Sequence, residues 1–246
     1  QEDQEARGEG GNLTYTMTLS FSTLGCPQYT ITQAVEAAKR YGYDGISIRT
    51  VRGESYLPTL EEFSPEKISV TAKLIQKAGL SVPCVMTGVR FTSPDPAERE
   101  THLRTAEAYI EIASALGSPT IRIFGGPIPP DQDEHKTMEW IIEGFRKTGD
   151  LAARRGIRVL LETHDSFSTG AKARHLIEAV SHPNIAVVWD FLHSCRFGES
   201  LEATWDQVGQ WVQDVHVKDS SRYSPKGFDL KLPGEGTLPI PEAIRL

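Results

Sequence analysis

The chain has 246 residues and a formal net charge of -7, with 39% hydrophobic and 24% charged residues. A single domain of this length buries a large core, so it needs no disulfide or structural metal to hold it together. The acidic balance argues against a nucleic-acid-binding surface, because phosphate groups are bound by clustered Lys and Arg. No apolar run in the sequence approaches the roughly 18 residues that a membrane span requires. The expected partner is therefore a small molecule, with no nucleic acid and no membrane.

The cysteines and the N-terminus predict where the protein resides. Cys26, Cys84 and Cys195 are odd in number and widely spaced, which fits neither a disulfide framework nor a zinc knuckle and predicts a cytoplasmic location. Residues 1–13 are polar and rich in Gly, and they lack the basic and apolar regions of a signal peptide. We expect them to form a disordered tail or to be a cloning remnant, and residues 14–246 to form one domain.

After this tail, short β-rich segments alternate with longer helical patterns. A first strand is expected near Tyr15 to Phe21, followed by a helix over residues 31–42 with Gly42 at its C-cap. A second strand is expected over residues 44–50. Ser64 then has the character of an N-cap before a proline at the first helical position, and it predicts a helix that runs to the KAGL segment.

The same alternation continues along the rest of the chain. Further strands are expected over residues 81–87, 119–126, 156–164, 184–193 and 212–219. Further helices are expected over residues 96–116, 134–155, 171–180 and 201–207, and residues 238–244 have the pattern of one more helix beginning. Continuous apolar runs such as RVLLE and IAVVWD suit parallel strands that are buried on both faces. Alternating β and α units imply a parallel sheet covered by helices.

Polar residues at the strand ends distinguish a closed barrel from an open sheet. Glu162, Asp190 and His216 each lie at or near the C-terminal end of a different predicted strand. In a barrel these ends converge on one mouth, whereas an open sheet spreads them along a line. The segment after the first strand also lacks both a GxGxxG fingerprint and a P-loop. The sequence therefore predicts a (β/α)8 TIM barrel.

The barrel predicted in this way ends before its eighth strand. Seven strands are expected, and an eighth strand with its helix would need roughly 30 further residues. Either the chain was cut, or something else completes the ring. Unpaired edges on the first and seventh strands would favour aggregation. Assembly into a homo-oligomer stays open.

The three strand-end residues also form a candidate metal site. Glu162, Asp190 and His216 offer carboxylate oxygen and imidazole nitrogen from three neighbouring strands, a mixture that Mn, Mg, Co and Zn ions accept. A lone Asp after a strand is usually a turn or cap residue, and a lone His is usually a hydrogen-bonded surface residue. Their joint position after buried apolar strands is what indicates a site.

The run from LETH through WDFLH and HVKD to LPGEG resembles the xylose isomerase-like sugar phosphate isomerase/epimerase superfamily, over nearly the whole chain. The resemblance implies that Glu162, Asp190 and His216 bind a divalent metal at the barrel mouth. It also implies that His193, three residues after Asp190, holds a substrate hydroxyl. Arg222 matches a substrate-contacting Arg of the ketose 3-epimerase branch.

The chain departs from this family at the fourth metal ligand, a Glu on the eighth strand. Glu235 in the PGEG segment is an additional candidate. In the resembling proteins, however, this loop precedes the last helix and strand, so a role at the rim or in a substrate loop fits better. In the epimerase branch the first and last Glu act as the acid/base pair. Glu162 alone would supply half of this machinery.

Five further residues near the strand ends are secondary candidates. His164 follows Glu162 by two residues and would contact the substrate or lie in the loop beyond the ligands. Lys218 follows His216 by two residues and would neutralise a charged substrate or lie in solvent. Arg49 and Arg122 also lie near strand ends, as does Glu54, but barrel interiors often bury such residues in structural ion pairs.

The function expected from this set is a metal-dependent sugar isomerase or epimerase of carbohydrate metabolism, acting on a sugar or polyol, with or without a phosphate. Glu162 would remove a proton next to the substrate carbonyl, giving a metal-stabilised enediolate. A dehydratase or lyase shares this first step and stays open. So does a non-catalytic barrel with an incomplete metal site. A nuclease on the same barrel is disfavoured, because no His ends the second or third expected strand and the net charge opposes DNA binding.

Overall fold

The computed structural model of the chain describes residues 17–246, and seven short strands in this range run parallel. They are β1 (Ser20–Ser22), β2 (Gly45–Ser47), β3 (Cys84–Met86), β4 (Thr120–Phe124), β5 (Arg158–Glu162), β6 (Ile185–Asp190) and β7 (Val212–His216). β1 pairs with β2, and β3 to β7 pair in chain order. Two parallel bridges, Gly45 to Ser81 and Ile48 to Val85, join the two groups. The predicted tail over residues 1–13 lies outside the described residues.

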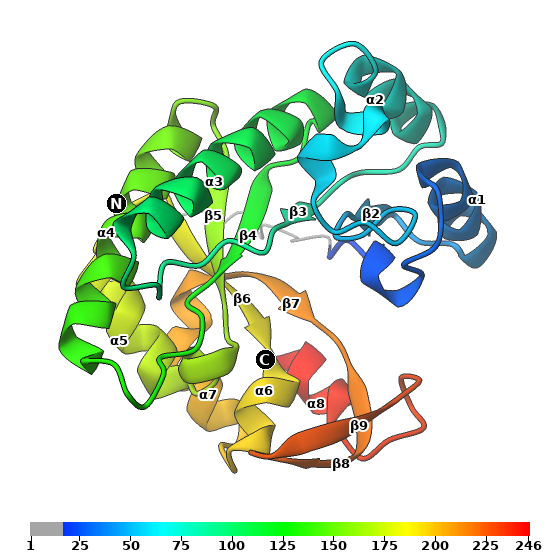
Figure 1. Cartoon of the computed structure of the whole chain (residues 1–246). Helices are drawn as coiled ribbons and strands as arrows, with labels where there is room; N and C mark the ends of the chain where they lie inside the picture. The colour runs from blue at the N-terminus through cyan, green and yellow to red at the C-terminus, as the bar shows by residue number, and fades with distance from the viewer. Residues whose placement is uncertain (1–16) are drawn as a thin grey trace, which may run out of the picture.

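Helices connect successive strands, as the sequence predicts. They are α1 (Ile31–Tyr41), α2 (Ile68–Lys77), α3 (Pro96–Leu116), α4 (Glu134–Ala153), α5 (Gly170–Val180), α6 (Phe191–Arg196), α7 (Leu201–Val208) and α8 (Ile240–Arg245). Figure 1 shows α1 to α5 on the outer side of the strands. None of the helices in residues 17–246 is long and apolar enough to cross a membrane.

The two faces of the strands bury different residues. Alternate positions face outward and join the main core under the helices, among them Ile121, Ile123, Val159, Leu161 and Val187. The positions between them form a smaller inner cluster of Cys84, Met86, Leu160, Ala186 and Val188. Because side chains alternate along a strand, Glu162 follows Leu160 and Asp190 follows Val188 on the inner face. The strand pattern thus aims both carboxylates into the barrel.

Local signals fix several element ends, and several predicted ends are wrong, because most strands are shorter than predicted. Gly42 ends α1 in the left-handed conformation at φ 74°, as predicted. The predicted helix start at Ser64 is wrong, because residues 65–67 form a turn and α2 begins at Ile68. The amides of Lys67 and Ile68 both donate to the Ser64 carbonyl in this turn, and the N-cap of α2 is Lys67, which makes no side-chain capping bond. The sixth strand ends at Asp190 instead of residue 193, where α6 takes over.

A hairpin that the sequence did not predict follows β7. The seventh strand stops at His216, and β8 (Asp219–Ser224) then pairs antiparallel with β9 (Gly227–Lys231). The buried carboxylate of Asp219 accepts hydrogen bonds from the amides of Ser220, Gly234, Gly236 and Leu238 at 2.8–3.2 Å. One side chain therefore ties the loop after β9 back to the start of β8. The helix predicted at the C-terminal segment is confirmed as α8.

Candidate metal centre

The three candidate ligands end three neighbouring strands. Glu162 is the last residue of β5, Asp190 of β6 and His216 of β7. The register places Asp190 directly beside His216. One ligand atom from each residue lies within 4.8 Å of the others, and the carboxylates of Glu162 and Asp190 are 2% and 0% exposed. The structure therefore brings this group together.

Glu162 lies between two cationic side chains. Its Oε2 is 2.8 Å from Nε of Arg122 on β4, and its Oε1 is 3.3 Å from Nδ1 of His216. Burial alone would raise the pKa of Glu162, but Arg122 and His216 outweigh it and hold this pKa well below its usual range. Burial would likewise lower the pKa of His216, yet the carboxylates of Glu162 and Asp190 raise it to about 9. Glu162 is therefore ionised across the neutral pH range.

Asp190 offers an oxygen that fits a cation. Its Oδ2 forms an ion pair with Nζ of Lys218 and lies 3.8 Å from Nδ1 of His216. Its Oδ1 is buried and accepts no hydrogen bond from any residue between 17 and 246. A buried carboxylate oxygen without a donor is costly, so such an atom calls for an explanation. Two carboxylates and one imidazole are ligands that divalent ions accept, so the residues present fit a metal.

His193 lies beside the ligands, on the short helix α6. It is 1% exposed, and its Nε2 is 3.7 Å from Oδ2 of Asp190 and 3.4 Å from Nζ of Lys218. Its Nδ1 is 3.1 Å from Nη1 of Arg196. Burial lowers the pKa of His193 to about 4, although Asp190 opposes this shift. His193 is thus a neutral imidazole next to the candidate metal ligands.

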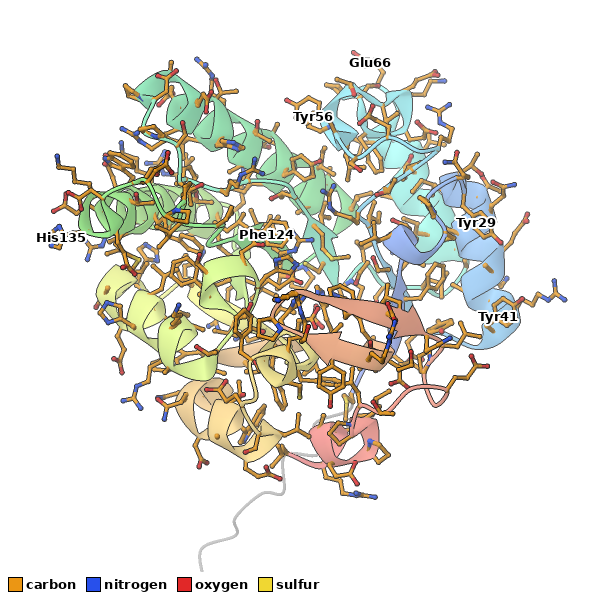
Figure 2. The ribbon with its side chains drawn as sticks, turned by 60° about the horizontal axis from the view of Figure 1, so that its bottom comes forward. Tyr29, Tyr41, Tyr56, Glu66, Phe124 and His135 are labelled. Carbon is orange, nitrogen blue, oxygen red and sulfur yellow. The ribbon has the colours of Figure 1, made fainter. Side chains whose placement is uncertain are left out.

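His164 belongs to the same neighbourhood. Its ring centroid lies 4.0 Å from that of His193 and 4.9 Å from that of Phe124, whose ring lies under the Arg122 guanidinium. Figure 2 shows Phe124 near the middle of the molecule, far from the labelled residues at its periphery. His164, His193 and Glu162 form a second group with ligand atoms within 4.8 Å of one another. His164 follows Glu162 by two residues, and the structure places it next to the candidate ligands.

Two predicted site residues lie elsewhere. Arg222 on β8 pairs with Asp229 on β9 at 2.6 Å, and its side chain is 84% exposed. Glu235 is exposed in the loop after β9. Neither is part of the two groups above, so their roles stay predictions. The structural ion pair expected for a strand-end residue is present at Arg122, and its partner, Glu162, was not predicted.

Sequence comparison identifies relatives that are enzymes of related kinds. A 2-oxo-tetronate isomerase of Pectobacterium atrosepticum is 27% identical over 106 residues, 40% of this chain and 40% of the relative. A 3-dehydroshikimate dehydratase of Bacillus anthracis is 27% identical over 127 residues, 51% of this chain and 45% of the relative. The chain thus spans less than half the length of these two relatives. A putative L-ribulose-5-phosphate 3-epimerase of Haemophilus influenzae is 21% identical over 76% of this chain and 68% of the relative.

Solved structures share the fold at low sequence identity. A probable 3-DHS dehydratase from Bacillus anthracis matches with a TM-score of 0.77 and 22% identity, covering 93% of this chain and 88% of that one. The IOLI protein with a bound zinc atom matches at 0.78 and 18%, covering 93% and 84%. A xylose isomerase-like TIM barrel protein from Mycobacterium smegmatis in complex with magnesium matches at 0.73 and 18%, covering 94% and 85%. The predicted barrel fold is confirmed.

The family comparison covers most of the chain, including every strand from β2 to β7 and all of the candidate ligands. The family model described as xylose isomerase-like TIM barrel matches residues 35–246. This match agrees with the parallel β/α order and with the position of Glu162, Asp190 and His216 at the carboxyl ends of their strands. The chain belongs to the xylose isomerase-like TIM barrel family.

Proposed function

We propose that the chain is a divalent-metal-dependent isomerase or epimerase of a sugar or sugar derivative, with Glu162, Asp190 and His216 as metal ligands. The observation that carries this proposal is their convergence within 4.8 Å at the ends of three adjacent strands, with an oxygen of Asp190 buried and without a donor. Relatives named as an isomerase and a putative epimerase support it. We take Mn, Mg, Co and Zn as the candidate ions, and the three free thiols favour a reducing cytoplasm.

The protein's own groups supply the proton transfer. A divalent ion, when bound, polarises the substrate carbonyl and stabilises the negative charge that develops on its oxygen. Glu162 is ionised and takes the proton from the carbon next to that carbonyl, leaving an enediolate. Delivery of a proton from solvent to the other face of the same carbon gives the epimer, and Glu162 then loses the abstracted proton to solvent. Return of the abstracted proton by Glu162 to the former carbonyl carbon, with transfer of a proton between the two enediolate oxygens, gives the isomer.

The residues around the ligands orient the substrate in this proposal. Lys218 carries a positive charge beside Asp190, where it would hold a developing oxyanion. The neutral imidazole of His193 and the ring of His164 would hydrogen-bond to substrate hydroxyls. We assign Arg222 and Glu235 to the rim, because both lie on the exposed hairpin and loop after β7.

A dehydratase is the second candidate. The same enediolate or enolate loses a hydroxyl from the carbon beyond, and a group acting as general acid protonates this leaving oxygen. The 27% identity to a 3-dehydroshikimate dehydratase favours this reaction. The first step, removal of a proton next to a carbonyl, is common to both candidates.

Proton exchange with solvent tests that first step. The Mn-loaded protein is incubated in D2O with 2-oxo-tetronate, L-ribulose 5-phosphate or 3-dehydroshikimate, and deuterium incorporation and products are followed by NMR. We expect exchange in at least one of them, and Glu162→Gln is expected to slow it by roughly 10²–10⁴-fold, the usual contribution of a general base. The matched control is Glu111→Gln, which removes a surface ion pair with Arg155 on the outer helices.

Two results would contradict this proposal. Full exchange by Glu162→Gln would remove Glu162 from the role of base. Absence of exchange in every substrate, with the metal bound, would argue for a barrel that binds without catalysing.

A further inference from the structure

Arg49 places a half-buried positive charge at the carboxyl end of β2. Its amide donates to Oγ1 of Thr23 at 2.9 Å, which fixes the main chain at the end of β1. Its Nη2 lies over Gly88, where an added Cβ would be 3.7 Å away, so the side chain reaches across the end of β3 toward β4. The guanidinium therefore points along the same strand ends that carry the candidate metal ligands.

The charge of Arg49 has no carboxylate partner within residues 17–246. Nη1 donates to the Ser55 carbonyl at 3.0 Å, and this is the one hydrogen bond that the guanidinium makes to those residues. Arg122, in contrast, is held by Glu162 and by the Thr87 carbonyl. Burial, followed by repulsion from Arg122, lowers the pKa of Arg49. A guanidinium has five N–H donors, so most of its donors remain free.

The balance of charge around the ligands is positive once an ion is bound. Arg49, Arg122, Lys218 and Arg196 supply four positive charges, and the acidic groups among them are Glu162, Asp190, Asp165 and Asp214, whose pKa is raised by burial. A divalent ion adds two more positive charges to this group. Water-filled surroundings screen part of this excess, but buried charges are screened less. The site as a whole therefore attracts an anion.

We propose that Arg49 binds a carboxylate of the substrate, which makes the substrate an acidic sugar derivative, such as a keto acid or polyhydroxy acid. This inference rests on the proposed function for the reacting end of the molecule, since the carbonyl and hydroxyl go to the metal ligands and the carboxylate goes to Arg49. The planar fork of Arg matches the two oxygens of a carboxylate. The two relatives at 27% identity are named for acids, 2-oxo-tetronate and 3-dehydroshikimate.

A phosphate fits this position less well. Phosphate sites in barrels are usually built from loop amides and a helix N-terminus after the last two strands. Arg49 lies instead after β2, where no run of glycines is present and where the second guanidinium, that of Arg52, is paired with Glu62. The structure therefore favours a carboxylate over a phosphate at Arg49.

Matched pairs of neutral and acidic ligands test the inference. Calorimetry on the Mn-loaded full chain compares 3-dehydroshikimate with its methyl ester and 2-oxo-tetronate with erythrulose, its neutral counterpart. L-Ribulose 5-phosphate with L-ribulose serves as the phosphate pair. In the wild type at least one acid is expected to bind 10-fold or more tightly than its neutral partner. Arg49→Ala is expected to weaken the binding of that acid by about 10- to 100-fold and to leave the affinity for the neutral ligand unchanged. Arg49→Lys is expected to recover part of the lost affinity.

The outcomes separate this inference from the proposed function. Two results overturn the role of Arg49. One is that the wild type binds the acidic and the neutral ligand of each pair with equal affinity, and the other is that Arg49→Ala keeps the preference for the acid. A preference confined to the phosphate pair overturns the carboxylate assignment. Unchanged Mn content and unchanged binding of the neutral ligand show that Arg49→Ala is folded. Binding needs no turnover, so a preference that depends on Arg49 without any deuterium exchange would sink the proposed reaction alone.

Discussion

The imidazole of His216 joins two carboxylates and, with its pKa raised to about 9, carries a proton at neutral pH. A metal ligand must be the neutral imidazole, so an ion bound at the proposed site would compete with a proton for this ring. Because the raised pKa lies above neutral pH, the proton is bound below about pH 9, and metal affinity falls as the pH is lowered.

We therefore predict that Mn binding at pH 7.5 releases about one proton per ion. The apparent Kd should rise by about tenfold for each pH unit below that, as expected for one competing proton. Titration in weakly buffered solution with a pH indicator measures the release, and His216→Gln is the control that should release none. Tight Mn binding by the wild type without proton release would show that His216 is not a ligand.

At the scale of single residues, strand parity made most of the site predictable. Glu162, Asp190 and His216 follow apolar strands, and the inner face that they share can be counted from the sequence. The ion pair between Arg122 and Glu162 could not be predicted, because it depends on which strands are neighbours and on their register. The exposure of Arg222 could not be predicted either, because it follows from a hairpin that leaves the barrel.

At the scale of elements, the close approach of α4 to the loop after β3 depends on Gly144. A Cβ at this position would lie 2.2 Å from Cγ of Phe91, which is 2% exposed. We predict that Gly144→Ala lowers the free energy of unfolding by about 1–3 kcal/mol through overpacking, even though Ala favours a helix. Urea denaturation measures the loss. Gly227→Ala, where nothing lies within 4 Å, is the control and should leave the free energy of unfolding nearly unchanged. Equal stability of both variants would show that α4 shifts away from Phe91 at no cost.

The order of strands and helices was predictable because each apolar run is short and is separated from the next by a helical pattern. Element ends were less predictable. The segment after Asp190 is apolar enough to continue a strand, yet it turns into α6, where the apolar Phe191 and Leu192 are buried on a helix instead. The start of α2 moved past Ser64 because a tight turn there uses the main-chain carbonyl. The β8–β9 hairpin is polar and carries no regular apolar alternation over most of its length.

At the scale of the whole molecule, a metal ion would link the ends of three strands, β5, β6 and β7. The first and last of the candidate ligands, Glu162 and His216, lie 54 residues apart along the chain. Such an ion binds the folded state alone, so it stabilises the fold by about 2.7 kcal/mol at a concentration 100 times its Kd. We predict that Mn raises the Tm by roughly 5–10 °C, from about 2–4 °C per kcal/mol for a chain of this size.

Thermal denaturation with excess EDTA and with excess Mn measures this shift. Asp190→Asn, which removes a ligand charge and keeps the side-chain shape, should abolish the rise. An equal rise in wild type and Asp190→Asn would place the ion elsewhere in the molecule.

The Asp219 carboxylate has a consequence for how this part of the chain can diverge. Since the path of the loop after β9 is set by amides that donate to Asp219, the side chains of the loop are largely released from defining its shape. Two glycines are exceptions, Gly236, where an added Cβ would lie 2.1 Å from that carboxylate, and Gly234, whose φ of 91° favours glycine. Residues such as Glu235 can therefore be substituted in evolution without a change in the backbone path of the loop. A family can adapt this rim to new ligands at little cost to its scaffold.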